Sequence, residues 1–310
     1  MSVQSSAQTP ASNSTPPAPA GGPAATREQV VQNAIREISH IATLPEITLK
    51  IVSIVEDPSS TAQDLHNVIS KDPALCTRIL KVVNSAFYGL PGQIGSINRA
   101  IVLLGLNAVK NIAIAASLAK LFKGGQLTPT FSARDLWTHS LAVGTATKLL
   151  AEQMKIGLGD EAFLAGLIHD IGIMVEMQWD RNRLVEVLQK AAATPGADML
   201  AIEIQVFGAT HQDFGSSLSE RWKFPKSFTT VIGHHHTPME LPYDQRTMAC
   251  MVFIADRLAA EDPKNGFRQD VVNLDIPDDV LESVRLTHED LAQVRAKMPE
   301  AIKVAEAVLG

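Results

Sequence analysis

Residues that favour the start of a helix recur from residue 27 to the end of the chain, and they constrain the fold more than any other feature. These positions are Thr61, Asp72-Pro73, Ser96, Ser132, Asp160, Pro225 and Thr287. The apolar residues that follow them repeat at intervals of three and four, as one buried face of a helix requires. No segment of the sequence combines sustained alternation of apolar and polar residues with a hairpin turn. The sequence therefore predicts an all-α fold.

The composition agrees with packed helices. Aromatic residues make up 5% of the chain, whereas hydrophobic residues make up 45%. The core must therefore consist of small and aliphatic side chains, which suit helices better than a sandwich of strands. A chain of 310 residues is long enough to bury such a core without disulfide bonds.

Three regions follow from the distribution of residue types. Residues 1–26 contain no charged side chain and consist mainly of Ser, Ala, Thr, Gln, Gly and Pro, which predicts a disordered tail. Gly124-Gly125 interrupts the helical pattern and indicates a boundary near residue 128. We therefore expect an N-terminal helical bundle over residues 27–128 and a second helical unit over residues 129–310.

Charge and hydropathy exclude several classes of partner. The net charge of -6 disfavours general binding to nucleic acid, because acidic surfaces repel the phosphate backbone. The apolar runs are too short to span a bilayer. The first 26 residues also lack the positive charge of a signal peptide. We expect a cytoplasmic protein that neither enters a membrane nor binds nucleic acid.

Histidine and aspartate gather in short apolar segments of the second half. The candidate ligands for a metal are His139, His169, Asp170, His211, His235, His236 and Asp256, with Asp135 as a possible addition. Imidazole and carboxylate together suit Zn, Mn or Fe, and burying so many polar groups without a purpose would be costly.

Spacing also indicates how these residues could share a site. On one helix the adjacent His169 and Asp170 would diverge by about 100°. They would then straddle a site, in which the carboxylate could bridge two ions. Asp135 lies one turn before His139 and would face the same way. We expect one or two divalent ions.

The order of these residues is similar to that in the HD superfamily of metal-dependent phosphohydrolases, and most similar to the cyclic-di-GMP phosphodiesterases called HD-GYP proteins. Other segments resemble the signature of the HDOD family: Leu44-Pro45, Ile69–Leu75, Arg78–Leu80, Val83–Ser85, Ala100–Gly105, Phe163–Gly166 and Phe207–His211. The chain is identified as a member of the HDOD family over residues 38–260. This resemblance implies a multi-helical fold in which an N-terminal bundle packs on an HD-like helical subdomain.

Two departures from the active enzymes bear on function. Where those enzymes carry lysine after His-Asp-x-Gly, this chain has Ile173, which cannot stabilise the charge of a phosphate. The Gly-Tyr-Pro loop is replaced by Pro238–Tyr243. The resemblance therefore implies a non-catalytic or weakly catalytic signal-transduction module with an HD-type metal site.

The expected partners are signalling proteins recruited in trans, such as components of a two-component or cyclic-di-GMP pathway. The alternative is a metal-dependent phosphohydrolase that acts on cyclic dinucleotides or related nucleotides. In that case Asp170 would hold both ions.

Overall fold

The computed structural model describes residues 25–310 except 39–43, 58, 123–124, 195 and 272. The all-α prediction is confirmed. The helices are α1 (Arg27–Glu37), α2 (Glu46–Glu56), α3 (Ala62–Ile69), α4 (Pro73–Val83), α5 (Ile97–Leu104), α6 (Leu106–Leu118), α7 (Ala133–Gln153), α8 (Gly159–Ile168), α9 (Ile171–Trp179), α10 (Arg181–Ala193), α11 (Met199–Val206), α12 (His211–Arg221), α13 (Lys226–His234), α14 (Thr247–Ala260), α15 (Asp278–Val284) and α16 (His288–Leu309). Short 3-10 turns cover Pro238–Glu240 and Pro263–Asn265. Most of the predicted tail, residues 1–24, lies outside the described residues.

Side-chain caps explain why the helices begin where the sequence predicts. The side chains of Thr61, Ser96, Ser132 and Thr287 each accept a hydrogen bond from the backbone N–H three residues later. Asp72 does the same before Pro73. Helix α8 begins at Gly159, one residue before the start predicted at Asp160.

A short hairpin was not predicted. Strand β1 (Gln126–Thr128) pairs antiparallel with β2 (Phe131–Ser132). These strands are too short to show alternation in the sequence. The ring of Phe131 is fully buried and meets the ring of Phe267 edge to face, with centroids 5.1 Å apart.

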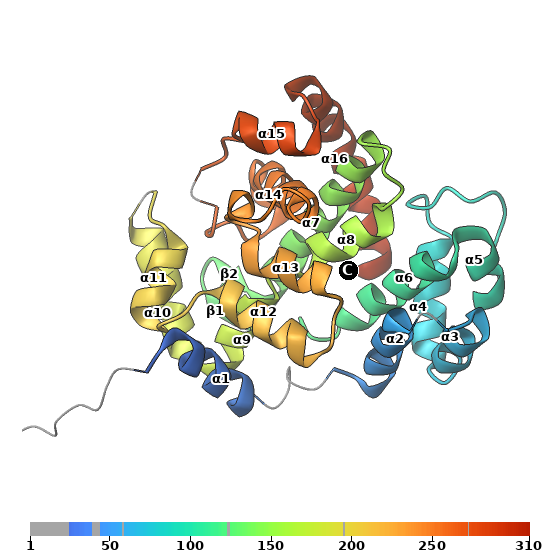
Figure 1. Cartoon of the computed structure of the whole chain (residues 1–310), viewed down its shortest axis with the longest axis horizontal. Helices are drawn as coiled ribbons and strands as arrows, with labels where there is room; N and C mark the ends of the chain where they lie inside the picture. Colours follow the sequence, from blue (N-terminus) through green and yellow to red (C-terminus); the bar gives the residue numbers. More distant parts are fainter. Residues whose placement is uncertain (1–24, 39–43, 58, 123–124, 195, 272) are drawn as a thin grey trace, which may run out of the picture.

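The helices fall into two groups joined through α6 and α16 (Figure 1). Helices α2 to α6 form one group, and α7 to α9 with α12 to α15 form the other, from which α10 and α11 project. Helix α1 lies with the second group, because Arg27 binds Asp213 and Arg221 binds the carbonyl of Ile35. The boundary near residue 128 stays a prediction.

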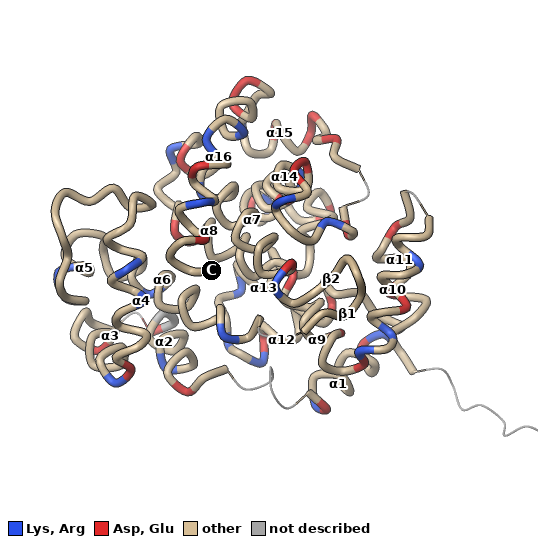
Figure 2. The backbone as a smooth tube through the Cα atoms, turned by 180° about the vertical axis from the view of Figure 1, so that it is seen from behind, with Lys and Arg blue, Asp and Glu red and all other residues tan. Residues whose placement is uncertain are grey.

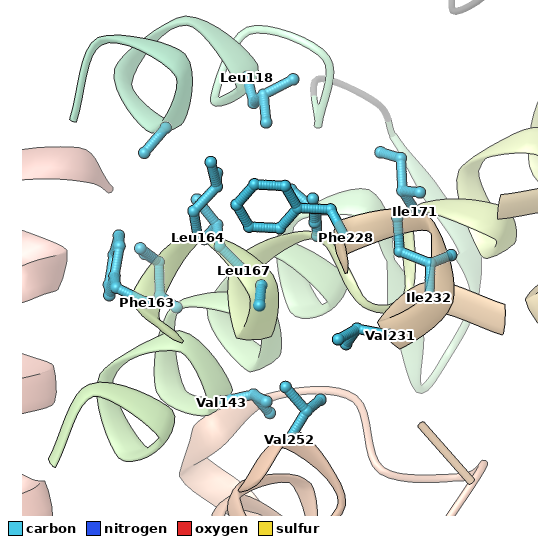
Figure 3. Close-up of a cluster of buried hydrophobic side chains, with 14 of the residues drawn as sticks. Leu118, Val143, Phe163, Leu164, Leu167, Ile171, Phe228, Val231, Ile232 and Val252 are labelled. Carbon is cyan, nitrogen blue, oxygen red and sulfur yellow. The ribbon is translucent and has the colours of Figure 1, made fainter. Parts of the chain in front are cut away.

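The apolar core joins both groups. Figure 3 shows Leu118 of α6 above Leu164 of α8, with Phe228 of α13 beside them and Val143 of α7 and Val252 of α14 below. All five side chains are buried. Burying apolar area of this kind is the main source of stability in such a bundle.

Most of the charged residues that the structure describes, by contrast, are not buried. Figure 2 shows acidic and basic residues interspersed on the helices, for example around α16. No helix among the described residues is both long enough and apolar enough to cross a membrane.

Two pairs of helices approach backbone to backbone at glycines. A Cβ at Gly166 of α8 would lie 2.8 Å from the Cα of Gly144 in α7. A Cβ at Gly172 of α9 would lie 1.8 Å from the carbonyl oxygen of His211, the first residue of α12. No side chain fits at either position, so glycine brings together the helices that carry the candidate ligands.

The turn after α4 attaches the first group to the second. Asn84 follows the last residue of α4, and its side chain hydrogen-bonds the carbonyls of Leu80 and Ile94 and the N–H of Ile94. Farther along the turn, the hydroxyl of Tyr88 donates to Asp160 at 2.7 Å. The ammonium of Lys148 lies 4.2 Å from the centre of the Tyr88 ring.

Replacing Tyr88 by phenylalanine tests this attachment. The Tyr88→Phe variant loses a hydrogen bond to a carboxylate, so its free energy of unfolding should fall by about 1–2 kcal/mol. Urea denaturation followed by circular dichroism measures this change. Tyr243→Phe is the matched control, because Tyr243 is 62% exposed, and it should change stability by less than about 0.5 kcal/mol. Equal effects in the two variants would contradict the proposed attachment.

Replacing Gly172 by alanine tests the close approach of α9 and α12. The added methyl group collides with backbone, so the Gly172→Ala variant should lose about 3 kcal/mol or more. Gly159→Ala is the control, since a Cβ there would meet only the Lys148 side chain at 3.6 Å. A thermal melt that shows Gly172→Ala to be as stable as the control would refute the argument.

Candidate metal centre

Most of the candidate ligands lie at the ends of helices. His169 follows the last residue of α8, and Asp170 precedes the first residue of α9. We expected both on one helix, but the backbone of Asp170 departs from helical geometry, with φ -95° and ψ 15°. His211 begins α12 and His235 follows α13, whereas His139 and Asp256 lie within α7 and α14.

Asp170 lies at the centre of the cluster. One oxygen, Oδ2, is 3.2 Å from Nε2 of His169 and 3.8 Å from Nε2 of His139. The other, Oδ1, is 3.3 Å from Nε2 of His235 and 3.6 Å from Nε2 of His211. The two oxygens therefore face different pairs of histidines, which is the arrangement that a bridging carboxylate requires.

Three overlapping groups have candidate ligand atoms within 4.8 Å of one another. The groups are Asp170, His211, His235 and His236; His139, His169, Asp170 and Asp270; and His236, Asp256 and Asp270. All the predicted ligands except Asp135 belong to at least one group. Asp135 instead accepts a hydrogen bond from the hydroxyl of Ser132 at the start of α7.

Asp270 was not found from the sequence. It lies in an irregular segment between α14 and α15, where no helical or strand period marks a residue as buried. It belongs to two of the three groups. In a single sequence, nothing distinguishes a lone aspartate outside every recognised motif from an ordinary exposed aspartate.

The cluster is closed to solvent. His139, His169, Asp170, His211, His235 and Asp256 each have an exposed fraction of 0%. The side chain of His236 is 7% exposed and that of Asp270 is fully buried. The chemistry of the site is therefore that of a low-dielectric interior.

Hydrogen bonds on the far side of the imidazole rings orient the histidines. Nδ1 of His169 donates to the carbonyl of Gly166 at 2.7 Å, and Nδ1 of His235 donates to the carbonyl of Ile232 at 2.9 Å. Because a carbonyl can only accept, each Nδ1 carries a proton. Nε2 is then the atom that faces the cluster, and it offers its lone pair to a metal ion when the ring is neutral. This is the arrangement of metal-binding histidines.

Glu203 of α11 performs the same task for His211. Its carboxylate lies 2.9 Å from Nδ1 of His211 and also accepts the backbone N–H of His211 at 2.9 Å. Glu203 was not among the residues predicted from the sequence. A single carboxylate within the apolar run of α11 was the available signal, and the same is true of Glu176 in α9.

Charges in the cluster shift the pKa values strongly. Burial opposes the charged form of His169, but the Asp170 carboxylate more than compensates and raises its pKa to about 9. Burial likewise opposes a charge on His211, and the Glu203 carboxylate raises its pKa to about 10. Burial lowers the pKa of His235 to about 4. Burial and the charge of Asp170 raise the pKa of Asp270 well above its usual range.

The residues present fit a divalent metal ion. Among the described residues, both oxygens of Asp170, Asp256 and Asp270 and Nε2 of His169 form no hydrogen bond of ordinary geometry, although they are buried. Leaving such atoms unpaired is costly. Nitrogen and carboxylate oxygen are suitable ligands for Zn, Mn and Fe, and a cation would also favour the ionised carboxyls.

The carboxylates of the cluster form no ion pair with a lysine or arginine side chain among the described residues. Asp170, Asp256 and Asp270 instead form ion pairs with histidines. Ile173, which stands where the active enzymes carry lysine, is fully buried in α9.

Comparison with known proteins gives a family and a fold. A family model described as the HDOD domain matches residues 41–238. A curated relative from Treponema pallidum (strain Nichols), called an uncharacterized protein, is 25% identical over 224 residues. The match covers 71% of this chain, but the chain spans only 42% of the relative's length.

Two solved structures show the same fold. One, from Shewanella amazonensis SB2B, has a name that suggests a phosphohydrolase; its TM-score is 0.70 at 23% identity, over 91% of this chain and 98% of that chain. The other, from Marinobacter aquaeolei VT8, has a name that suggests signal transduction; its TM-score is 0.68 at 21% identity, over 91% and 64%. The multi-helical fold predicted from the sequence is thereby confirmed.

Glu203 should strengthen metal binding without touching the metal. In the Glu203→Gln variant the partner of His211 is a neutral amide, so the ring is less basic and less firmly oriented. We expect the affinity for Zn²⁺ to fall about 10–100-fold, measured by competition with a chelating dye. Glu220→Gln, on the exposed end of α12, should bind Zn²⁺ like the wild type. If both variants bind equally well, Glu203 has no such role.

Proposed function

The chain belongs to the HDOD domain family, and on that premise we propose that it is a signalling module that holds one or two divalent metal ions and hydrolyses phosphodiesters poorly or not at all. The ion would be Fe, Mn or Zn, held by His139, His169, Asp170, His211, His235, His236 and Asp256. Asp135 is left out of this set, because its carboxylate pairs with Ser132 at the start of α7.

The burial of the cluster is the observation that carries this proposal. A phosphodiesterase must bring a large anionic substrate within reach of its ions, whereas here the ligand side chains are at most 7% exposed. The carboxylates also have no lysine or arginine ion pair among the described residues that could be redirected to a phosphate. An ion in this site is well placed to stabilise the fold around it and poorly placed to meet a nucleotide.

The position of Asp170 supports a second candidate, a metal-dependent phosphohydrolase that acts on cyclic dinucleotides or related nucleotides. Its two oxygens face separate histidine pairs, as expected of a residue that holds two ions. When bound, such ions supply Lewis acidity and lower the pKa of bound water. The similar structure from Shewanella amazonensis SB2B, whose name suggests a phosphohydrolase, points in the same direction.

Partners would be signalling proteins recruited in trans, for example in a two-component or cyclic-di-GMP pathway. Figure 2 shows acidic and basic residues interspersed along several helices, and charges of both signs can orient a protein partner during association.

Metal analysis and a hydrolysis assay together test the proposal. We expect purified wild-type protein to contain a divalent metal, measured by mass spectrometry, and Asp170→Asn to contain about tenfold less. We also expect the two proteins to show the same negligible hydrolysis of cyclic-di-GMP. Metal-dependent turnover that is lost in Asp170→Asn would establish the second candidate. A wild-type protein that binds no metal when titrated would refute the metal site in both.

A further inference from the structure

We propose that Asp270 is a metal ligand carried by residues 266–271, and that the bound ion holds this segment closed over the cluster. The inference rests on the proposed metal site and adds a residue that lies beyond the segment matched by the family model, residues 41–238. It also assigns a consequence to metal binding, namely the local stability of one irregular segment.

Asp270 lies close to candidate ligands in two parts of the cluster. Its candidate ligand atom groups with those of His139, His169 and Asp170, and separately with those of His236 and Asp256. One of its oxygens, Oδ2, lies 3.6 Å from Nε2 of His236. Asp270 therefore reaches both sides of the site, as Asp170 does.

The burial of Asp270 requires a partner that the protein does not supply. Its side chain is fully buried, and among the described residues neither oxygen forms a hydrogen bond. The segment has no helical or strand hydrogen bonds that would force this residue inward. Burying a charged carboxylate without a partner is costly, and a cation among the same ligands would supply the partner that the described side chains do not.

The same segment covers one side of the cluster. The ring of Phe267 is 3% exposed and meets the ring of His139 edge to face, with centroids 6.2 Å apart. The N–H of Phe267 donates to the carbonyl of Asp135 at 3.2 Å. At Gly266, where φ is 88°, a Cβ would lie 2.2 Å from that same carbonyl oxygen. The segment thus lies directly against the first turns of α7.

The opposite side of the segment faces solvent. Arg268 is exposed although its neighbours Phe267 and Asp270 are buried. Because Asp270 can bind the ion only when the segment is closed, metal binding and closure must favour each other by the same factor. The metal would therefore determine how often a piece of the protein surface opens.

Hydrogen exchange with and without metal tests this coupling. Chelator-treated protein is titrated with Zn²⁺, which binds nitrogen and oxygen sites more tightly than Mn²⁺ or Fe²⁺ does. Exchange of the backbone amides of residues 266–271 is then followed by mass spectrometry. The variant is Asp270→Asn, which keeps the shape of the side chain. The control is Asp275→Asn, an exposed aspartate a few residues later that makes the same change in charge.

We expect Zn²⁺ to slow exchange of residues 266–271 by about tenfold or more in the wild type and in Asp275→Asn. In Asp270→Asn we expect no slowing, together with an affinity for Zn²⁺ that is about tenfold weaker or worse. If Asp270→Asn binds Zn²⁺ and slows exchange as the wild type does, the inference is wrong while the metal site stands. If the wild type binds no Zn²⁺ at all, the proposed function fails first.

Circular dichroism identifies a variant that does not fold. If Asp270→Asn does not fold, hydrogen exchange of the wild type alone tests whether metal binding and closure of the segment are coupled. Slowing of exchange at residues 266–271 upon addition of Zn²⁺ supports the coupling. Binding of Zn²⁺ with unchanged exchange at these residues overturns it.

Discussion

Three buried aspartates and the histidines around them direct oxygen and nitrogen atoms at one another. Without a positive charge between them, this arrangement is electrostatically unfavourable. Nδ1 of His169 and of His235 each donate outward to a carbonyl, so their Nε2 atoms face the oxygens of Asp170. A proton on Nε2 relieves the conflict at His169, whose pKa is about 9, but not at His235, whose pKa is about 4. A divalent cation would interact favourably with the neutral imidazole nitrogens and with the carboxylate oxygens alike.

The fold serves this electrostatic requirement by ending helices at the cluster. Asp170 and His211 lie at the starts of α9 and α12, and His169 and His235 lie at the ends of α8 and α13. A helix end can direct a side chain inward without exposing a whole polar face to the apolar core. Apolar residues of the same helices, such as Ile171 of α9 and Ile232 of α13, belong to the core shown in Figure 3.

The sequence predicted what depends on local chemistry. Caps such as Ser96 and Thr287 determine helix starts through hydrogen bonds to the next turn, and most of the candidate ligands were visible in short motifs. Features that depend on tertiary packing were missed: the break between His169 and Asp170, the inward position of Asp270, and the bond from Glu203 to His211. The spacing of apolar residues along one helix does not reveal which residue of another helix it will contact.

The glycine at position 172 also has an evolutionary consequence. Any side chain there would overlap the backbone of His211, whether or not an ion is bound nearby. A descendant that exchanged the histidines of the cluster for other residues would still have to keep this glycine as long as α9 and α12 stayed packed. A glycine at this position is therefore a mark of how these two helices pack and is independent of the chemistry of the cluster.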